Sequence, residues 1–363
     1  MKSVAIVQFS CQMCKADVTS DVSMKLSWML FGLCAACLPG TAAESPSRAT
    51  APPRPAPTAS AVRVPDQQQA CDIAETMYNT WRISMLNKDF QAWKSATGFA
   101  RQAKVHNLVV SEKKPYPAAI FEAQATPPSL ANLRFVGALG GSAGKTLAAT
   151  YFGKVDLGVG GQPSDNALVL LFVEDKGKWR YDQSRFFNLG HLPKVRERLA
   201  RGDASVLKEQ DGFHAYDTPP AIPPLCGAPQ LIGKVFVDAP TLRVEMTVNG
   251  ISTHVFEDCR LAEVISGGLK RGRNTVTYTV TPLSAEANKQ PLAIGLFVMP
   301  ETEGNQPATC FEHITAPGDT PQGGTYAFTV SDDMIRAMNP SLKMPKPAPF
   351  RPVPLKQKPE KAR

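Results

Sequence analysis

Apolar residues recur at three- and four-residue spacing just after residue 66. This spacing predicts an amphipathic helix of about five turns. The positions are Ala70, Ile73, Ala74, Met77, Tyr78, Trp81 and Met85. Asp89 then stands where an N-cap would begin a short helix carrying Phe90 and Trp93. A third helix is predicted from Gly98 to Val110, because Lys114-Pro115 follows as a stop signal.

Runs rich in β-branched and aromatic residues follow and predict four strands. They are Leu133–Leu139, Thr146–Val155, Leu168–Glu174 and Trp179–Phe187. Asp175-Lys-Gly177 reads as a hairpin turn, and a helix from Pro193 to Ala200 is expected to cover the sheet. In the last strand, alternation places Trp179, Tyr181 and Gln183 on one face and Arg180, Asp182 and Ser184 on the other.

A second group of alternating segments follows residue 230 and predicts an all-β accessory domain of the β-sandwich class. The segments are Leu231–Asp238, Leu242–Val248, Ser252–Glu257, Asn274–Thr281, Leu292–Met299 and Thr325–Ser331. Asn249-Gly250 is a strong hairpin signal, because both residues tolerate the positive φ angles of a tight turn.

Composition divides the chain further. With 363 residues, of which 43% are hydrophobic and 20% charged, the chain is long enough for two domains and is not disordered as a whole. Its 32 prolines cluster in segments that we interpret as linkers and a tail. The predicted order is a signal segment (1–43), a linker (44–66), an α+β domain (67–212), a linker (213–230), a β-sandwich (231–338) and a tail (339–363).

The segment from Met24 to Ala43 has the three parts of a secretory signal peptide. Lys25 is followed by an apolar run from Leu26 to Leu38, which covers only about 20 Å as a helix. That is too short for a permanent membrane span. We therefore expect translation to start at Met24 and the mature protein to be periplasmic or secreted, without a transmembrane segment. A lipid anchor at Cys37 is the alternative that fits the sequence less well.

The eight cysteines fall into two sets. Four have the spacing of a zinc ribbon, but two of these lie inside the apolar export run, so no metal site is predicted: Cys11, Cys14, Cys34 and Cys37. The mature chain keeps Cys71, Cys226, Cys259 and Cys310, and an even number in an exported protein predicts disulfides. Of the three possible pairings we favour Cys259–Cys310 with Cys71–Cys226. Four buried thiols are the alternative.

The positive charge lies mainly in the tail. The whole chain has a formal net charge of +8, and residues 339–363 contain seven basic residues, one acidic residue (Glu360) and seven prolines. The folded part is therefore close to neutral, which argues against a nucleic-acid-binding domain. We expect the tail to be an extended, polyproline-like cationic arm that is either solvated or in contact with an anionic envelope surface.

Helices followed by a hairpin-rich sheet that ends in the strand KGKWRYDQSRFF resemble the NTF2-like (cystatin-like cone) superfamily over about residues 67–200. The resemblance implies a curved antiparallel sheet that wraps a long helix and leaves a cone-shaped apolar pocket. Some members of this superfamily are isomerases, dehydratases or epoxide hydrolases, and many only bind ligands or partners.

The resemblance makes Trp81, His106, Tyr181, Asp182 and Arg185 the candidate pocket residues. No spacing shows that the polar ones converge. We therefore favour an exported binding or scaffold protein that takes a small apolar ligand or an envelope protein, without a cofactor. The alternative from this site is an isomerase or hydrolase that uses Asp182.

Gly140-Gly-Ser142-Ala-Gly144 fits the G-x-S-x-G pattern of a nucleophile elbow, and Asp238 and His254 would complete a triad by chain order. An elbow requires a strand, a sharp turn and a helix, whereas strands are predicted on both sides here. A phosphate loop fails on the same ground. The favoured interpretation is a glycine-rich hairpin, and a serine hydrolase based on Ser142 is the second enzymatic alternative.

Overall fold

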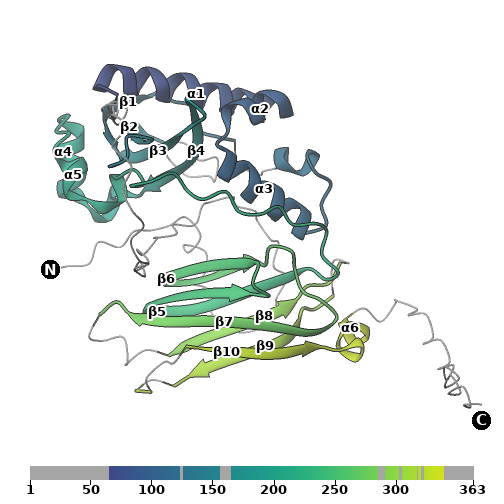
Figure 1. Ribbon diagram of the computed structural model, residues 1–363. Coiled ribbons are helices and arrows are strands. Elements are labelled where there is room, and N and C mark those ends of the chain that lie inside the picture. The colour runs from purple at the N-terminus through teal and green to yellow at the C-terminus, as the bar shows by residue number, and fades with distance from the viewer. Residues whose placement is uncertain are drawn as a thin grey trace, which may run out of the picture.

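The computed structural model describes residues 65–122, 126–155, 165–284, 291–301, 305–316, 318–319 and 323–338. The predicted signal segment, nearly all of the first linker and the tail lie outside these residues. No helix in the described ranges has both the length and the hydrophobicity that crossing a bilayer requires. Figure 1 shows a first unit, from α1 to η3, and a second unit, from β5 to α6.

The first unit opens with the predicted helices. They are α1 (Gln67–Asn87), α2 (Phe90–Ala96) and α3 (Phe99–Ser111), followed by the 3₁₀ turn η1 (Ala118–Phe121). The side chain of Asp66 accepts a hydrogen bond from the Gln69 amide, and the Gln69 side chain accepts one from the Asp66 amide, which completes a capping box. Asp89 caps α2, as its sequence position predicted.

Four antiparallel strands form the first sheet in the order β1-β2-β3-β4. They are β1 (Leu133–Gly140), β2 (Thr146–Lys154), β3 (Asp165–Asp175) and β4 (Lys178–Phe187). Lys176 and Gly177 both have positive φ angles, 52° and 76°, as a tight hairpin turn requires. The predicted hairpin is therefore confirmed.

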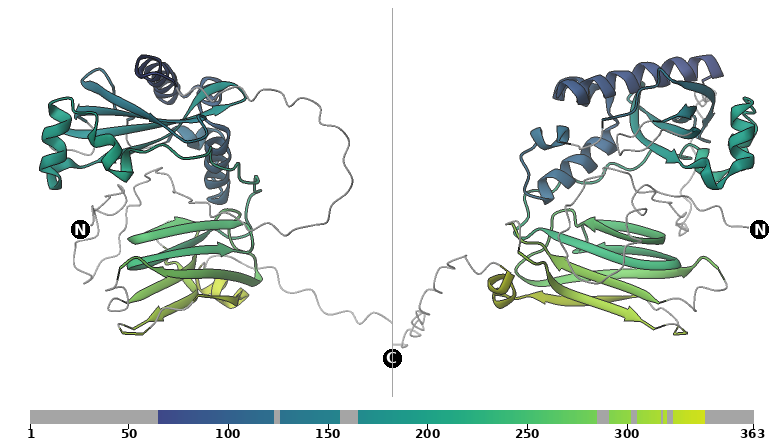
Figure 2. Two further views of the ribbon diagram at one scale, coloured as in Figure 1. Left: turned by 60° about the vertical axis from the view of Figure 1, so that its left-hand side comes forward. Right: turned by 180° about the vertical axis from the view of Figure 1, so that it is seen from behind.

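Both faces of this sheet are covered (Figure 2). Helix α1 packs on one face, where Tyr78 and Leu170 belong to the same buried cluster. The other face packs against α4 (Pro193–Ala200), α5 (Val206–Glu209) and η3 (Asp211–Phe213). Strand β3 is consequently buried continuously from Asn166 to Val173.

The second unit contains six strands and a short helix. They are β5 (Gly233–Val248), β6 (Ser252–Val264), β7 (Gly272–Pro282), β8 (Leu292–Val298), β9 (Ala308–Thr315), β10 (Gly324–Val330) and α6 (Asp332–Met338). All pairs are antiparallel in the order β10-β7-β5-β8-β9, with β6 also paired to β5. The prediction missed β9, whose mostly part-exposed residues lack a clear apolar alternation.

Two predicted strands are in fact the two halves of β5, which bends at its middle. Its first half pairs with β8 and its second half with β7. At the bend Thr241 and Asp258 have positive φ angles of 59° and 43°. The Thr241 amide donates to Asp258 Oδ1 at 2.8 Å, which joins the corner of β5 to that of β6.

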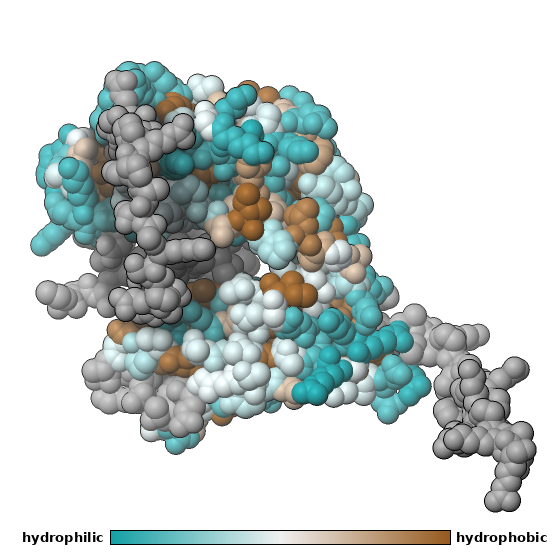
Figure 3. Space-filling view, viewed as in Figure 1, coloured by the Kyte–Doolittle hydropathy of each residue, from teal (hydrophilic) through white to brown (hydrophobic). Residues whose placement is uncertain are grey.

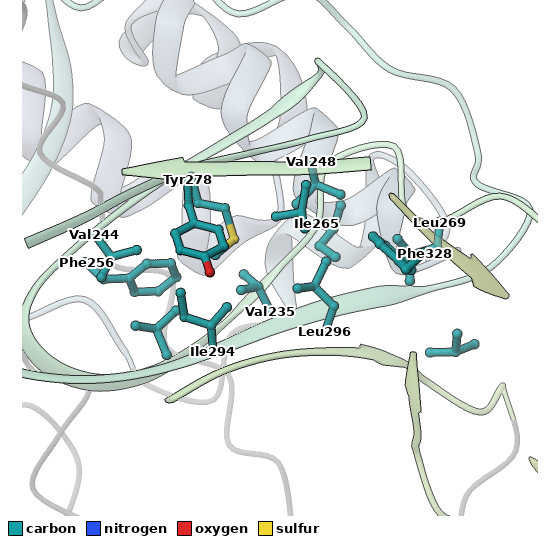
Figure 4. Close-up of a cluster of buried hydrophobic side chains, with 14 of the residues drawn as sticks. Val235, Val244, Val248, Phe256, Ile265, Leu269, Tyr278, Ile294, Leu296 and Phe328 are labelled. Carbon is teal, nitrogen blue, oxygen red and sulfur yellow. The ribbon is translucent and has the colours of Figure 1, made fainter. Parts of the chain in front are cut away.

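The bent sheet encloses the core of the second unit (Figure 4). Val235, Ile294 and Leu296 come from the half that contains β8, and they meet Val244 and Phe256 from the half that contains β7. The α+β class predicted from the sequence is confirmed, with helices and one antiparallel sheet in the first unit and mainly strands in the second.

The end of α3 and the predicted proline-rich linker connect the units. Asn107 Nδ2 donates to the Pro224 carbonyl at 2.9 Å, and the Cys226 amide donates to Asn107 Oδ1 at 2.9 Å. Ser111 Oγ accepts a hydrogen bond from the Gly267 amide at 2.8 Å. The segment around Pro224 is therefore held along α3. On the face seen in Figure 3, several hydrophobic residues are exposed where the two units meet.

A group of charged side chains lies at the same junction. Lys113 forms an ion pair with Glu301. The Glu112 side chain is only 7% exposed, and its Oε2 lies 3.9 Å from Lys114 Nζ, near Lys234 of β5. Burial raises the pKa of Glu112 to about 7, although both of these lysines oppose the shift.

We predict that Glu112 makes stability depend on pH. The pKa of Glu112 rises from 4.5 in the unfolded chain to about 7 in the folded chain, so the folded chain holds the proton more tightly. The protonated carboxyl therefore contributes to the free energy of unfolding below pH 4.5, and this contribution is lost as the pH rises from 4.5 to about 7. The effect is at most roughly 3 kcal/mol, because each pKa unit corresponds to about 1.4 kcal/mol. Urea unfolding at several pH values should show a flatter profile for Glu112→Gln than for the wild type. The exposed control Glu75→Gln should retain the wild-type profile, and identical profiles for all three proteins would contradict the prediction.

Candidate functional site

Two of the predicted pocket residues meet between α1 and the first sheet. The ring centroids of Trp81 and Tyr181 are 4.3 Å apart, and those of Tyr78 and Tyr181 are 5.5 Å apart. Tyr78 also donates a hydrogen bond to the Pro128 carbonyl at 2.8 Å. These rings fill the space in which the resemblance placed an apolar pocket.

Asp182 lies in a β-bulge that the sequence did not show. Leu171 faces Gln183 and Phe172 faces Tyr181, which leaves Asp182 as the extra residue of β4. Tyr181, Asp182 and Gln183 are therefore all buried in succession. The predicted alternation is wrong at this point, because the bulge turns Tyr181 and Gln183 to opposite sides of the sheet.

Tyr216, which the sequence analysis did not single out, brings Asp182 and Arg185 together. Its hydroxyl donates to Asp182 Oδ2 at 3.2 Å and accepts a hydrogen bond from Gln183 Nε2. The Arg185 guanidinium lies 5.5 Å from the centre of the Tyr216 ring and donates to the His214 carbonyl at 3.1 Å. The segment after the last predicted helix of this domain contains two aromatic residues, Phe213 and Tyr216, and no spacing in the sequence singles out Tyr216.

Burial is the main cause that raises the pKa of Asp182, and it outweighs the opposing charges of Arg101 and Lys104. His106 does not join this group. Its ring packs against Tyr116, with centroids 4.8 Å apart. The structure thus brings two of the predicted polar residues together and separates the third.

Ser142 lies in the turn of the antiparallel β1–β2 hairpin, so the nucleophile-elbow interpretation is wrong. Its Oγ is exposed and lies 3.4 Å from both the carbonyl oxygen and Oδ1 of Asp217. Asp238 and His254, the proposed triad partners, both belong to strands of the second unit. The hairpin geometry instead agrees with the favoured glycine-rich turn.

In the second unit, the same His254 is hydrogen-bonded to a different serine and a different carboxylate. Ser252 Oγ lies 2.8 Å from His254 Nε2, and His254 Nδ1 lies 2.7 Å from Glu263 Oε2. This is the order of atoms in serine-hydrolase triads. Ser252 and His254 share a face of β6 by alternation, but only the bend of β6 brings Glu263 back to them.

Burial prevents this array from acting as an open catalytic site. Ser252 is 1% exposed and His254 is 3% exposed. The Ser266 amide already donates to Ser252 Oγ at 2.8 Å. A nucleophile must be reachable by substrate. We therefore interpret Ser252, His254 and Glu263 as a buried hydrogen-bonded group that joins the two halves of the bent sheet.

None of the four described cysteines forms a disulfide, so the favoured pairings are absent from the structure. Cys259 and Cys310 lie on β6 and β9, which β5 and β8 separate in the sheet. Cys71 Sγ donates to Glu75 on α1, whereas Cys226 Sγ lies 3.5 Å from Ser111 Oγ. Within the described ranges, no group of three His, Cys, Asp or Glu side chains is placed to hold a metal ion.

A hollow of about 410 Å³ lies between the start of α1 and β4. It is lined by Pro65, Gln69, Asp72, Ile73 and Trp179. Ile73 and Trp179 also pack against the buried cluster beneath α1, so the floor is apolar, whereas Gln69 and Asp72 supply polar groups at the rim. This volume falls within the range of ligand sites, about 300–1,000 Å³. The hollow is shallow, and most of it is open to solvent.

Comparison of the chain with protein-family models, with curated proteins and with solved structures gives no match. The assignment of function therefore depends on the chemistry of three places: the hollow, the buried Asp182 with Tyr216, and the buried Ser252 with His254. Of these three, the hollow alone combines an accessible apolar surface with polar groups at its edge.

We predict that Ser252→Ala lowers the free energy of unfolding by about 1–3 kcal/mol. The substitution leaves His254 Nε2 and the Ser266 amide buried without their partner. Urea denaturation measures the change. The exposed neighbour Thr253→Ala is the control and should change stability by less than about 0.5 kcal/mol. Reaction of native Ser252 with a fluorophosphonate probe would contradict the structural role.

Proposed function

We propose that this chain is an exported, non-catalytic binding or scaffold protein of the cell envelope. The signal-peptide pattern from Met24 to Ala43 supports export. In this proposal the first unit is an NTF2-like cone and the second a β-sandwich. A long helix packed on an antiparallel sheet supports the former, and a sheet bent around one core supports the latter.

Aromatic side chains occupy the space beneath α1, so we place the proposed binding site outside the centre of the cone. Trp81 and Tyr181 already occupy that space with their own rings. The hollow beside Trp179 is therefore the proposed site, and it is the observation on which this function rests. Its partner is a small apolar ligand or an apolar segment of an envelope protein.

The positions of the acid–base groups favour binding over catalysis. Asp182 and Ser252 are buried and hydrogen-bonded to neighbouring groups. Asp72 is the acidic residue that lines the hollow, and its Oδ1 accepts a hydrogen bond from Gln68 Nε2 at 2.8 Å. An enzyme that uses Asp182 with Tyr216 is the alternative, because burial raises the pKa of that carboxyl.

We predict that Nile red, an uncharged fluorescent probe of apolar surface, binds at the hollow. Trp179→Ala and Ile73→Asp remove or charge the apolar floor and should weaken probe binding by roughly tenfold, about 1.4 kcal/mol. Fluorescence titration of the full chain measures this. Ile83→Asp is the control, because Ile83 is exposed on the same helix and does not line the hollow. Near-UV circular dichroism checks that each variant remains folded.

Two results would overturn the binding assignment. One is unchanged probe affinity in both hollow variants when the control behaves as expected. The other is turnover of an ester or epoxide substrate that Asp182→Asn abolishes while the variant stays folded.

A further inference from the structure

The rim of the hollow carries one acidic residue, Asp72. From Asp66 to Trp81 the chain carries three acidic residues, Asp66, Asp72 and Glu75, and no Lys or Arg. All three acidic residues are exposed. Lys178 and Arg180 flank Trp179 in β4, and alternation along the strand directs both side chains away from the face of Trp179. The hollow therefore presents an indole, an isoleucine and negative charge together.

Basic proline-rich peptides match this combination. Proline-rich segments adopt a preformed polyproline II helix and dock in aromatic-lined grooves, and basic side chains add attraction to acidic rims. Their low conformational entropy reduces the cost of binding. The chain itself contains such a sequence, since residues 343–356 read KMPKPAPFRPVPLK, with five prolines and four basic residues.

We propose that the hollow around Trp179 binds the basic, proline-rich tail of a second copy of this chain. The inference rests on the proposed function, because it names the partner of the same site. Prolines and Phe350 of the tail supply the apolar contacts to Trp179 and Ile73. Lys346 and Arg351 supply positive charge opposite the acidic rim.

The tail begins after α6, far from the hollow beside α1, and this favours the tail of a second copy over the tail of the same chain. The described chain ends at α6, which packs against β9 of the second unit. Figure 1 shows α6 beside the second sheet, whereas α1 lies on the far side of the first sheet. A tail bound to its own hollow would have to extend past both units, whereas a tail from a neighbouring molecule can approach the hollow directly.

The first experiment measures a labelled synthetic peptide of residues 343–356 by fluorescence anisotropy with the full chain. We expect saturable binding that weakens with added salt, because the charges lie at an exposed rim. Trp179→Ala and Asp72→Lys should each weaken binding at least about tenfold, or 1.4 kcal/mol. Ile83→Asp should bind as the wild type does, and a peptide in which Glu replaces Lys and Arg should not bind.

The second experiment tests the second copy. Sedimentation velocity of the full chain should show association that increases with concentration, and excess unlabelled peptide should reverse it. Deletion of residues 339–363 should abolish it. A full chain that stays monomeric while the peptide binds at the hollow would overturn the proposed second copy.

Absent peptide binding, or equal peptide binding by the wild type and both hollow variants, would also overturn the inference. The fluorescent probe separates this failure from that of the proposed function. If probe binding still depends on Trp179 and Ile73, the hollow remains a binding site and only the tail is excluded. If it does not, both proposals fail.

Discussion

The first unit depends on the need to cover an apolar sheet on both faces. Strand β3 is buried without interruption from Asn166 to Val173, so neither face can be left to water. Helix α1 covers one face with Tyr78 and Trp81, and α4 and α5 cover the other. The same packing leaves little interior space for a ligand. Among the described residues, the hollow lies at the edge of the covered sheet, where Trp179 is only partly buried.

Burial also decides what the polar groups of the second unit do. Ser252, His254 and Glu263 have the hydrogen-bond order of a hydrolytic triad, with distances of 2.8 and 2.7 Å, yet Ser252 and His254 are buried. Because β6 bends at Asp258, His254 and Glu263 belong to opposite halves of the sheet. Their contact holds those halves together, so the same three side chains serve folding in place of catalysis.

Local sequence patterns predicted the local elements well, because helix spacing, caps and tight turns are determined by neighbouring residues. The helix around Trp81 and the Asn249-Gly250 turn are examples. The features that were missed depend on contacts far apart in the chain. The bulge at Asp182 is visible only in the pairing of β3 with β4, and the partner of Asp182 is Tyr216, 34 residues later. Periodicity carries no information about such pairs.

Helix α3 explains how the two units are joined. At its start, Gly98 allows the chain to touch β3, because a Cβ there would lie 2.8 Å from Val173 Cγ2. The Phe99 amide donates to Asp175 Oδ2 at 2.7 Å, which fixes this end to the β3–β4 turn. At the other end, Ser111 accepts from the Gly267 amide of the second unit. One rigid helix of about 20 Å therefore ties the first sheet to the second unit. Substitutions at the junction should consequently affect the packing of the first sheet as well as the contact between the units.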